Sequence, residues 1–171
     1  MSIVLDGSNL TTTGVINSGT AAASTSGTSI DFTGIPSGTK RITVMLSGVS
    51  TNGGSDILIQ IGAGSITSSG YTGTSTSTLG STIGSTNFTT GYGIRAGGSS
   101  TSSIVRQGSC TICALGSNTW IESGVFSHSN EAGNVYSAGA VTLGGTLDRV
   151  RITTANGTDA FDLGSVNILY E

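Results

Sequence analysis

The only histidine of the chain lies in a short polar segment that also holds serine and a carboxylate. The segment is Ser127-His-Ser-Asn-Glu131. A hydrolase triad uses these residue types, but it needs three side chains that converge from separate elements and face an oxyanion hole. Neighbouring residues of one segment point apart, so we interpret His128 as a solvated loop residue and predict no catalytic site. A single histidine also excludes a multi-histidine metal centre.

Cys110 and Cys113 have the Cys-x-x-Cys spacing of redox and zinc-ribbon motifs. Both chemistries place the cysteines at a helix N-terminus or in a knuckle turn. Here the surrounding Ser-Cys-Thr-Ile-Cys-Ala-Leu is typical of a strand, in which residues three apart point to opposite faces. A zinc site also lacks its second cysteine pair. We therefore predict two separate reduced thiols, at least one of them in the core.

Three aspartates lie beside glycine-rich or Asn-Gly turns. Asp159 and Asp162 flank Phe161, and Asp56 follows the Asn52-Gly-Gly-Ser segment. A calcium ion is one interpretation of these carboxylates, but neither group has the regular acidic spacing of an EF-hand. We favour turn-capping carboxylates, and we expect neither a metal nor a cofactor.

The nine aromatic residues could serve the core or a binding surface. Aromatic faces stack on the apolar faces of sugar rings, yet a chain with so few aromatics needs most of them for its core, and we favour a core position for Trp120. The candidate contacts for a receptor or glycan are Tyr71, Phe88, Tyr92, Trp120 and Tyr136.

Composition decides the class of fold that carries these residues. Glycine, serine and threonine account for 83 of the 171 residues (28, 28 and 27), and the longest run without glycine, residues 146–156, has 11. Each glycine inside a helix costs about 1 kcal/mol relative to alanine, which excludes a helix bundle or an α/β fold. Few charges and one proline argue against disorder, so we predict an all-β protein.

Charge and hydropathy exclude several functional classes. The net charge is −3, with six scattered basic residues, so we expect no nucleic-acid partner. No apolar run approaches the about 20 residues of a membrane-spanning helix, and we expect no membrane insertion. The first six residues lack the basic segment of a secretion signal.

Period-2 alternation predicts about ten short strands, spaced as in an antiparallel β-sandwich or jelly roll. Residues 41–47 and 56–61 are expected to form a hairpin across the Asn-Gly-Gly loop, and residues 147–153 another across Asn156-Gly157. The remaining strands are predicted at 3–6, 28–32, 92–96, 104–107, 110–115, 119–126, 138–143, 160–162 and 166–170.

The chain divides into an N-terminal strand or arm, residues 1–19, and one β-sandwich domain, residues 20–171. Within the domain, 31 of the 42 residues at 62–103 are glycine, serine or threonine. A flexible loop is one interpretation of this stretch. We favour ordered loops and irregular strands that recurring apolar residues hold in place, because recognition loops are commonly carried on a rigid scaffold.

Several phrases of the sequence resemble a module at the C-terminal ends of tailed-bacteriophage tail-fibre and related virion proteins. They are Ile-Asp-Phe-Thr-Gly-Ile-Pro-Ser at 30–37, the run at 40–52, the segments 111–113 and 118–120, and the chain end at 145–159 and 167–171. The likeness spans most of the chain from about residue 20. No binding residue of the family transfers, and Gly38 stands where the family often has an aromatic residue.

The resemblance implies an all-β tip domain, commonly trimeric, that is displayed on a virion and attaches it to a host cell. The module usually follows a long shaft, whereas Met1 lies almost directly before the domain, so we expect either a fragment or a small protein that docks on a virion by itself. The alternatives are a capsid decoration or head-fibre protein and a carbohydrate-binding or depolymerising spike domain.

The low charge also favours an assembly. Only 15 residues are charged, and strand edges without charge tend to associate. A closed symmetric oligomer hides such edges, and we expect a homotrimer. The expected partners are thus identical subunits, other virion proteins and a host cell-surface glycan or protein, and the expected location is the virion.

Overall fold

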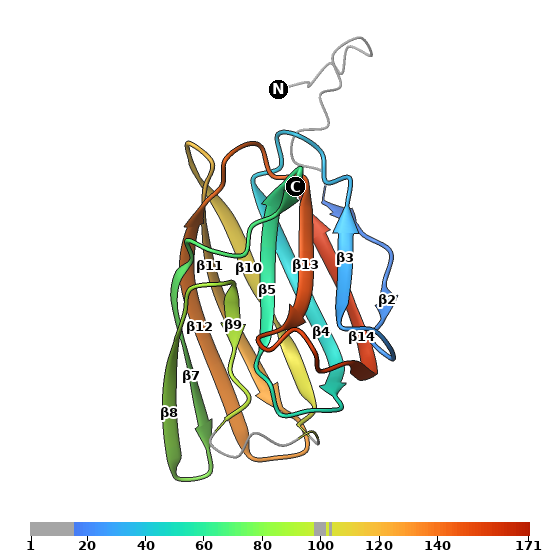
Figure 1. Cartoon of the computed structure of the whole chain (residues 1–171), viewed down its shortest axis with the longest axis vertical. Coiled ribbons are helices and arrows are strands. Elements are labelled where there is room, and N and C mark those ends of the chain that lie inside the picture. The colour runs from blue at the N-terminus through green and yellow to red at the C-terminus, as the bar shows by residue number, and fades with distance from the viewer. Residues whose placement is uncertain (1–15, 98–101, 103) are drawn as a thin grey trace, which may run out of the picture.

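Alternating apolar and polar residues build the strands, as the sequence predicts. The computed structural model describes residues 16–97, 102 and 104–171, which contain fourteen strands and no helix (Figure 1). In these residues, therefore, no helix has the length and hydropathy to cross a bilayer. The strands are β1 (Asn17–Ser18), β2 (Ala22–Ala23), β3 (Ser29–Thr33), β4 (Arg41–Thr51), β5 (Ile57–Ala63), β6 (Ser65–Ile66), β7 (Thr72–Leu79), β8 (Thr82–Phe88), β9 (Tyr92–Ile94), β10 (Arg106–Gly116), β11 (Thr119–His128), β12 (Gly133–Thr142), β13 (Arg149–Thr154) and β14 (Phe161–Tyr170).

The strands form two antiparallel sheets that face each other. The large sheet has the order β1-β14-β4-β10-β11-β12-β7-β8, with β2 also paired to β14. The small sheet has the order β3-β13-β5-β6, with β9 also paired to β5. In Figure 1 the small sheet lies in front of the large one, and β9 lies over β12 and β7. The predicted all-β class and antiparallel arrangement are confirmed.

The core lies between the inner faces of the two sheets. On β4, Ile42, Val44 and Leu46 point inward, and on β13, Val150 and Ile152 do the same, all with at most 4% of their surface exposed. These residues stand at alternate positions because successive side chains of a strand point to opposite faces. The inward assignment of these residues is confirmed.

The two predicted hairpins are wrong. β4 belongs to the large sheet and β5 to the small one, and β13 and β14 are divided in the same way. Each connection crosses from one sheet to the other, because β4 already pairs with β10 and β14, and β13 already pairs with β3 and β5. The chain does turn at both Asn-Gly segments, as predicted. The residues of a turn do not determine, however, which sheet the next strand joins.

The two crossing connections pack against each other. The backbone N–H of Ser55 donates to Asp159 Oδ2 (2.9 Å), and that of Ala160 donates to Asn52 Oδ1 (2.9 Å). A Cβ atom on Gly53 would lie 2.1 Å from the Asp159 carboxylate, so only glycine permits this approach. The similar Asn-Gly segments thus form one end of the sandwich together.

The stretch at 62–103 is more regular than predicted. Its described part, up to residue 97, contains β6, β7, β8 and β9, and β7 and β8 form a hairpin at the edge of the large sheet. The loops and irregular strands expected there are thus corrected to regular strands. On β7 the inward Ser75 and Ser77 are buried and the intervening threonines point outward, a period-2 pattern without an apolar face.

Several predicted strands are longer than expected. The predictions at 104–107 and 110–115 fall in the single strand β10, and those at 160–162 and 166–170 fall in β14. The predicted strand at 3–6 and most of the N-terminal arm lie outside the described residues. The described end of the arm contains β1, which pairs with β14.

Candidate functional site

His128 is buried, which corrects its assignment to a solvated loop. It ends β11, directly opposite Arg106 of β10, and its side chain is 2% exposed. Among the described residues, no partner lies within normal hydrogen-bond geometry of either ring nitrogen. Burial, and next the nearby positive charge of Arg106, lower the pKa of His128. Because Ser127 points to the opposite face of the strand, the two side chains cannot work as a triad pair.

Arg106 is a buried cation that the sequence did not reveal. Its side chain is 1% exposed, and it donates to the carbonyls of Ile104 (3.4 Å) and Ser55 (3.3 Å), while its Nε has no partner among the residues that the structure describes. Burial lowers the pKa of Arg106 to about 10. An arginine at the start of a strand gives no sequence signal of burial, because most arginines remain exposed.

The two cysteines are free and lie on opposite faces of β10, as predicted. Cys110 is buried and Cys113 is exposed. Cys110 lies in a polar cluster of the core with Glu122 and Ser137, three residues on three neighbouring strands. A Cβ atom on Gly124 would lie 2.5 Å from Cβ of Cys110 and 2.9 Å from Oε1 of Glu122, so this glycine makes room for the carboxyl group.

Glu122 is the most perturbed acid of the described residues. Its side chain is 1% exposed, Oε1 accepts a hydrogen bond from the Ser137 hydroxyl (2.8 Å), and Oε2 has no partner in the described part of the chain. Burial raises the pKa of Glu122 to about 7, against the smaller opposing effects of hydrogen bonds from Ser137 and Cys110. A lone acid without a second carboxylate does not make a glycosidase pair.

The turn aspartates accept hydrogen bonds, but mostly from segments distant in the sequence and not from their own turns. Asp56 accepts from the backbone N–H of Ala96 (2.6 Å), and Asp159 accepts from Ser55 and from the Asn156 side chain (2.7 Å). Asp162 accepts from the Ser50 hydroxyl. Among the residues that the structure describes, no group of three or more His, Cys, Asp or Glu side chains could hold a metal ion.

Four of the five aromatic candidates belong to the core, which corrects the assignment of Tyr71, Phe88 and Tyr92 as contacts; only Trp120 of these four also reaches a surface hollow. Tyr71, Phe88, Tyr92 and Trp120 are each at most 6% exposed, whereas Tyr136 is 50% exposed on the outer face of β12. The core position favoured for Trp120 is confirmed. Large aromatic surfaces are buried where hydrophobic side chains are scarce, and this chain has only nine aromatics.

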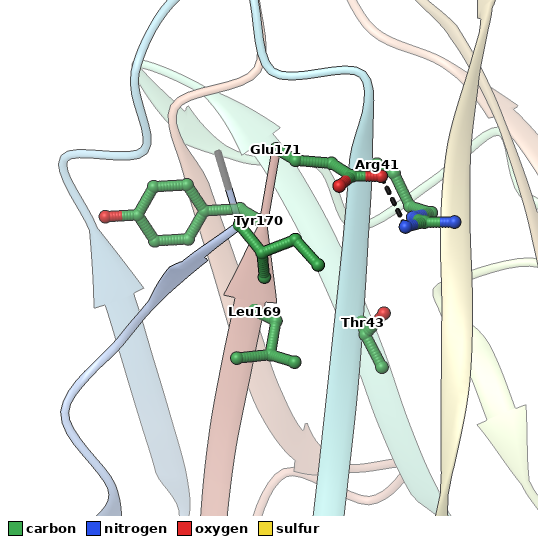
Figure 2. Close-up of a pocket in the computed structure, with 6 residues that line it drawn as sticks. Arg41, Thr43, Leu169, Tyr170 and Glu171 are labelled. Carbon is green, nitrogen blue, oxygen red and sulfur yellow. Dashed lines mark ion pairs between the residues drawn. The ribbon is translucent and has the colours of Figure 1, made fainter. Parts of the chain in front are cut away.

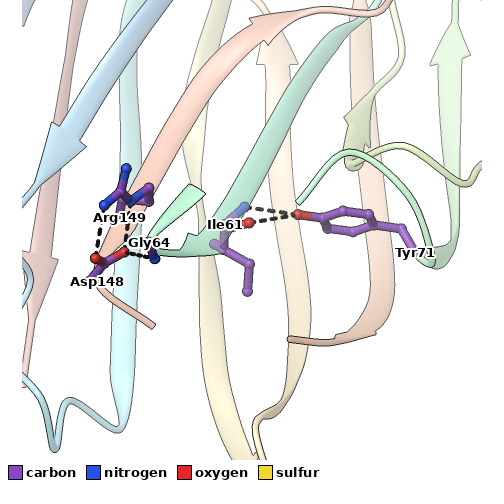
Figure 3. Close-up of polar contacts among 5 residues, drawn as sticks. All are labelled: Ile61, Gly64, Tyr71, Asp148 and Arg149. Carbon is purple, nitrogen blue, oxygen red and sulfur yellow. Dashed lines mark hydrogen bonds and ion pairs between the residues drawn. The ribbon is translucent and has the colours of Figure 1, made fainter. Parts of the chain in front are cut away.

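Tyr71 completes the edge of β5 (Figure 3). Its hydroxyl accepts a hydrogen bond from the backbone N–H of Ile61 (2.8 Å) and donates to the carbonyl of the same residue (3.3 Å). Ile61 lies between the stretch of β5 that pairs with β9 and the stretch that pairs with β6. The phenol therefore satisfies the buried N–H of Ile61, while the Ile61 carbonyl also accepts from the backbone N–H of Thr67 (3.0 Å). Nearby, Asp148 pairs with Arg149 and accepts from the N–H of Gly64 (Figure 3).

We expect Tyr71→Phe to lower the free energy of unfolding by about 1–3 kcal/mol, because the substitution leaves a buried backbone N–H unsatisfied without creating a cavity. Urea unfolding followed by circular dichroism measures this loss. Tyr136→Phe, which removes the same hydroxyl from an exposed side chain, serves as the control. An equal, small effect of both substitutions would contradict this role of Tyr71.

A hollow beside Trp120 lies at the end of the sandwich where the β3–β4, β10–β11 and β12–β13 connections meet. It has a volume of about 270 Å³. Trp120, which is 5% exposed, is among the residues that line it. Ser117 and Asn118 adopt positive φ angles of 49° and 59° in the tight β10–β11 turn that forms one wall. The lining residues are Gly38, Thr39, Lys40, Ala114, Gly116, Ser117, Asn118, Thr119, Trp120, Thr146 and Leu147.

Two other hollows are less suited to a polar ligand. A groove of about 270 Å³ separates β3 from β14 and β2, and Phe32, Ile35 and Ile168 give it apolar walls. A shallow hollow of about 40 Å³ lies beside the chain end, where Arg41 and Glu171 form an ion pair (Figure 2). The loop end around Trp120 is therefore the candidate binding site.

Comparisons with protein-family models, curated proteins and solved structures found no match to this chain. The candidate site is therefore argued from its geometry alone.

Proposed function

We propose that the chain is a non-enzymatic bacteriophage virion protein, similar to a tail-fibre tip, that attaches the particle to a host cell through its loop surface. The observation that carries this proposal is the hollow around Trp120, which three connections form at one end of a rigid sandwich. Loops on a rigid scaffold are a common location for recognition. The virion role itself comes from the resemblance of the sequence phrases.

The lining of the hollow supports a glycan or a polar protein surface as the ligand. Lys40, Asn118, Thr39 and Thr146 offer an ammonium group, an amide and hydroxyls around one aromatic edge. Ligand sites commonly combine an apolar base with a few polar groups that fix orientation. None of the residues that line the hollow carries a carboxyl group, the group that cleaves most glycosidic bonds, which agrees with a binding role.

A jelly-roll-like trimer is part of the proposal. The chain passes repeatedly between the two sheets, from β3 to β4 to β5 and from β12 to β13 to β14, which supports a wound sandwich. The scarcity of charge supports burial of surface against identical subunits.

The proposal is tested by binding of the labelled chain to a panel of bacterial cells, with released reducing ends measured in parallel. We expect saturable binding to susceptible cells and no release of sugar. In Lys40→Ala/Thr146→Ala, which loses two polar contacts of about 1 kcal/mol each, we expect affinity to fall about tenfold or more. Thr158→Ala, an exposed threonine at the opposite end, is the matched control.

Three results would contradict the proposal. If cells bind the wild type and the double variant with equal affinity, the hollow around Trp120 is not the binding site. Binding to expanded empty capsids but not to cells would favour the capsid decoration role. Release of reducing ends would establish the depolymerising alternative.

A further inference from the structure

The outer face of the large sheet carries no charge over five adjacent strands. Of the described side chains that point outward from β10, β11, β12, β7 and β8, none is acidic or basic. Threonine, serine and alanine fill most of these positions. By contrast, the outer face of the small sheet carries Asp31, Arg149 and Arg151, with Asp31 and Arg151 in a bidentate ion pair.

Exposed apolar side chains gather on the same uncharged face. Four of the seven exposed large hydrophobic residues of the described chain project from it, namely Ile83, Ile121, Val125 and Tyr136. Val125 and Tyr136 are direct neighbours across β11 and β12 and are 56% and 50% exposed. An apolar patch of this kind on a soluble protein marks a contact surface.

We propose that this face, centred on Val125 and Tyr136, is the surface that packs against a second copy of the chain. In a cyclic oligomer, residues near the symmetry axis lie close to the same residues of the other copies. A charged residue near the axis would therefore face an identical charge and be repelled. The uncharged face meets this requirement, and the small-sheet face does not. This inference rests on the homo-oligomeric part of the proposed function and not on host attachment.

The size of the face agrees with a stable contact. Five strands at a spacing of about 4.8 Å and with lengths of about 30 Å cover about 700 Å². A standard interface buries about 800 Å² on each partner. The hollows described above lie away from Val125 and Tyr136, so the centre of the face suits another flat surface better than a small ligand.

Cys113 provides a probe on this face without any substitution. It is exposed, points outward from β10, and lies opposite Ile121 of β11. Cys110 is buried in the same strand and should not react with an alkylating reagent in the folded protein. A contact across this face would therefore protect Cys113, and dilution would remove the protection.

The test combines equilibrium sedimentation at micromolar concentration with alkylation of Cys113. We expect a wild-type oligomer with slow alkylation, and in Val125→Glu and in Tyr136→Glu an association weakened at least about tenfold with faster alkylation. Both glutamates replace half-exposed side chains, so the fold should persist, as circular dichroism can verify. Thr33→Glu, which places the same charge on the outer face of the small sheet, is expected to leave both readouts unchanged.

Unchanged oligomers in both face variants, or full alkylation of Cys113 in the wild-type oligomer, would overturn the inference and place the contact elsewhere. A monomeric wild type would overturn it together with the trimer. Host attachment is read separately by cell binding, so its failure is distinguishable from failure of this contact.

Discussion

Raising the pH from about 5 to about 8 is expected to destabilise the protein through Glu122 by about 3 kcal/mol. The pKa of this buried carboxyl rises from its ordinary value of 4.5 to about 7 on folding, because burial disfavours the ionised form. A group whose pKa is higher in the folded state contributes stability below its unfolded pKa and loses it as the pH passes the folded pKa. The loss therefore falls between about pH 4.5 and about pH 7.

Glu122→Gln separates this effect from other titrations. Over the same window His128, whose pKa is lowered by burial, contributes in the opposite direction, because its neutral form is favoured in the folded state. That contribution cancels in the difference between wild type and variant. We expect the unfolding free energies of the two proteins in urea to differ little near pH 5, and the variant to be more stable near pH 8.

Ser137→Ala refines the same prediction. The Ser137 hydroxyl donates to Oε1 of Glu122 and favours the charged form. Without this hydroxyl, the pH at which half of the Glu122-dependent stability is lost should be higher. If the difference between wild type and Glu122→Gln does not change with pH, the carboxyl does not titrate in the core. All measurements use one protein concentration, because association is linked to stability.

The strands that could be predicted are those whose alternation is visible in residue type. β4 and β13 carry isoleucine and valine at every second position, and their inward residues follow directly. The alternation of β7 is not visible in residue type, because its buried positions are serines. Ser75 and Ser77 stay inside because Arg95 donates to both hydroxyls, from its backbone N–H (3.2 Å) and its Nη1 (2.5 Å). Such a long-range partner is not readable from a local pattern.

Sheet membership and polar burial were not predictable for a related reason. The Asn-Gly segments suit a hairpin locally, but β4 has its two neighbours from distant parts of the chain, and the next strand must join the other sheet. Likewise His128, Arg106 and Glu122 are polar residues in polar or mixed segments, and only the packing of the two sheets encloses them. In the candidate site, Trp120 was named from the sequence, while its hollow depends on three connections that meet only in the fold.

Tyr92→Ala is expected to lower the free energy of unfolding by about 3–5 kcal/mol, as truncation of a large buried aromatic does. The Tyr92 ring packs edge-on against Tyr71, with centroids 5.0 Å apart and planes at 88°. Its hydroxyl donates to the carbonyl of Trp120 (3.1 Å), which joins the small sheet to the large one. The substitution therefore removes ring packing and an inter-sheet hydrogen bond together.

Leu163→Ala is the matched control for Tyr92→Ala, because Leu163 is a large apolar side chain that is 51% exposed. Its truncation should change the free energy of unfolding by less than about 0.5 kcal/mol. Tyr92→Phe should fall between the two, since it keeps the ring and loses only the hydrogen bond. Urea unfolding followed by circular dichroism ranks the three variants. A Tyr92→Ala protein as stable as Leu163→Ala would mean that the ring does not hold the two sheets together.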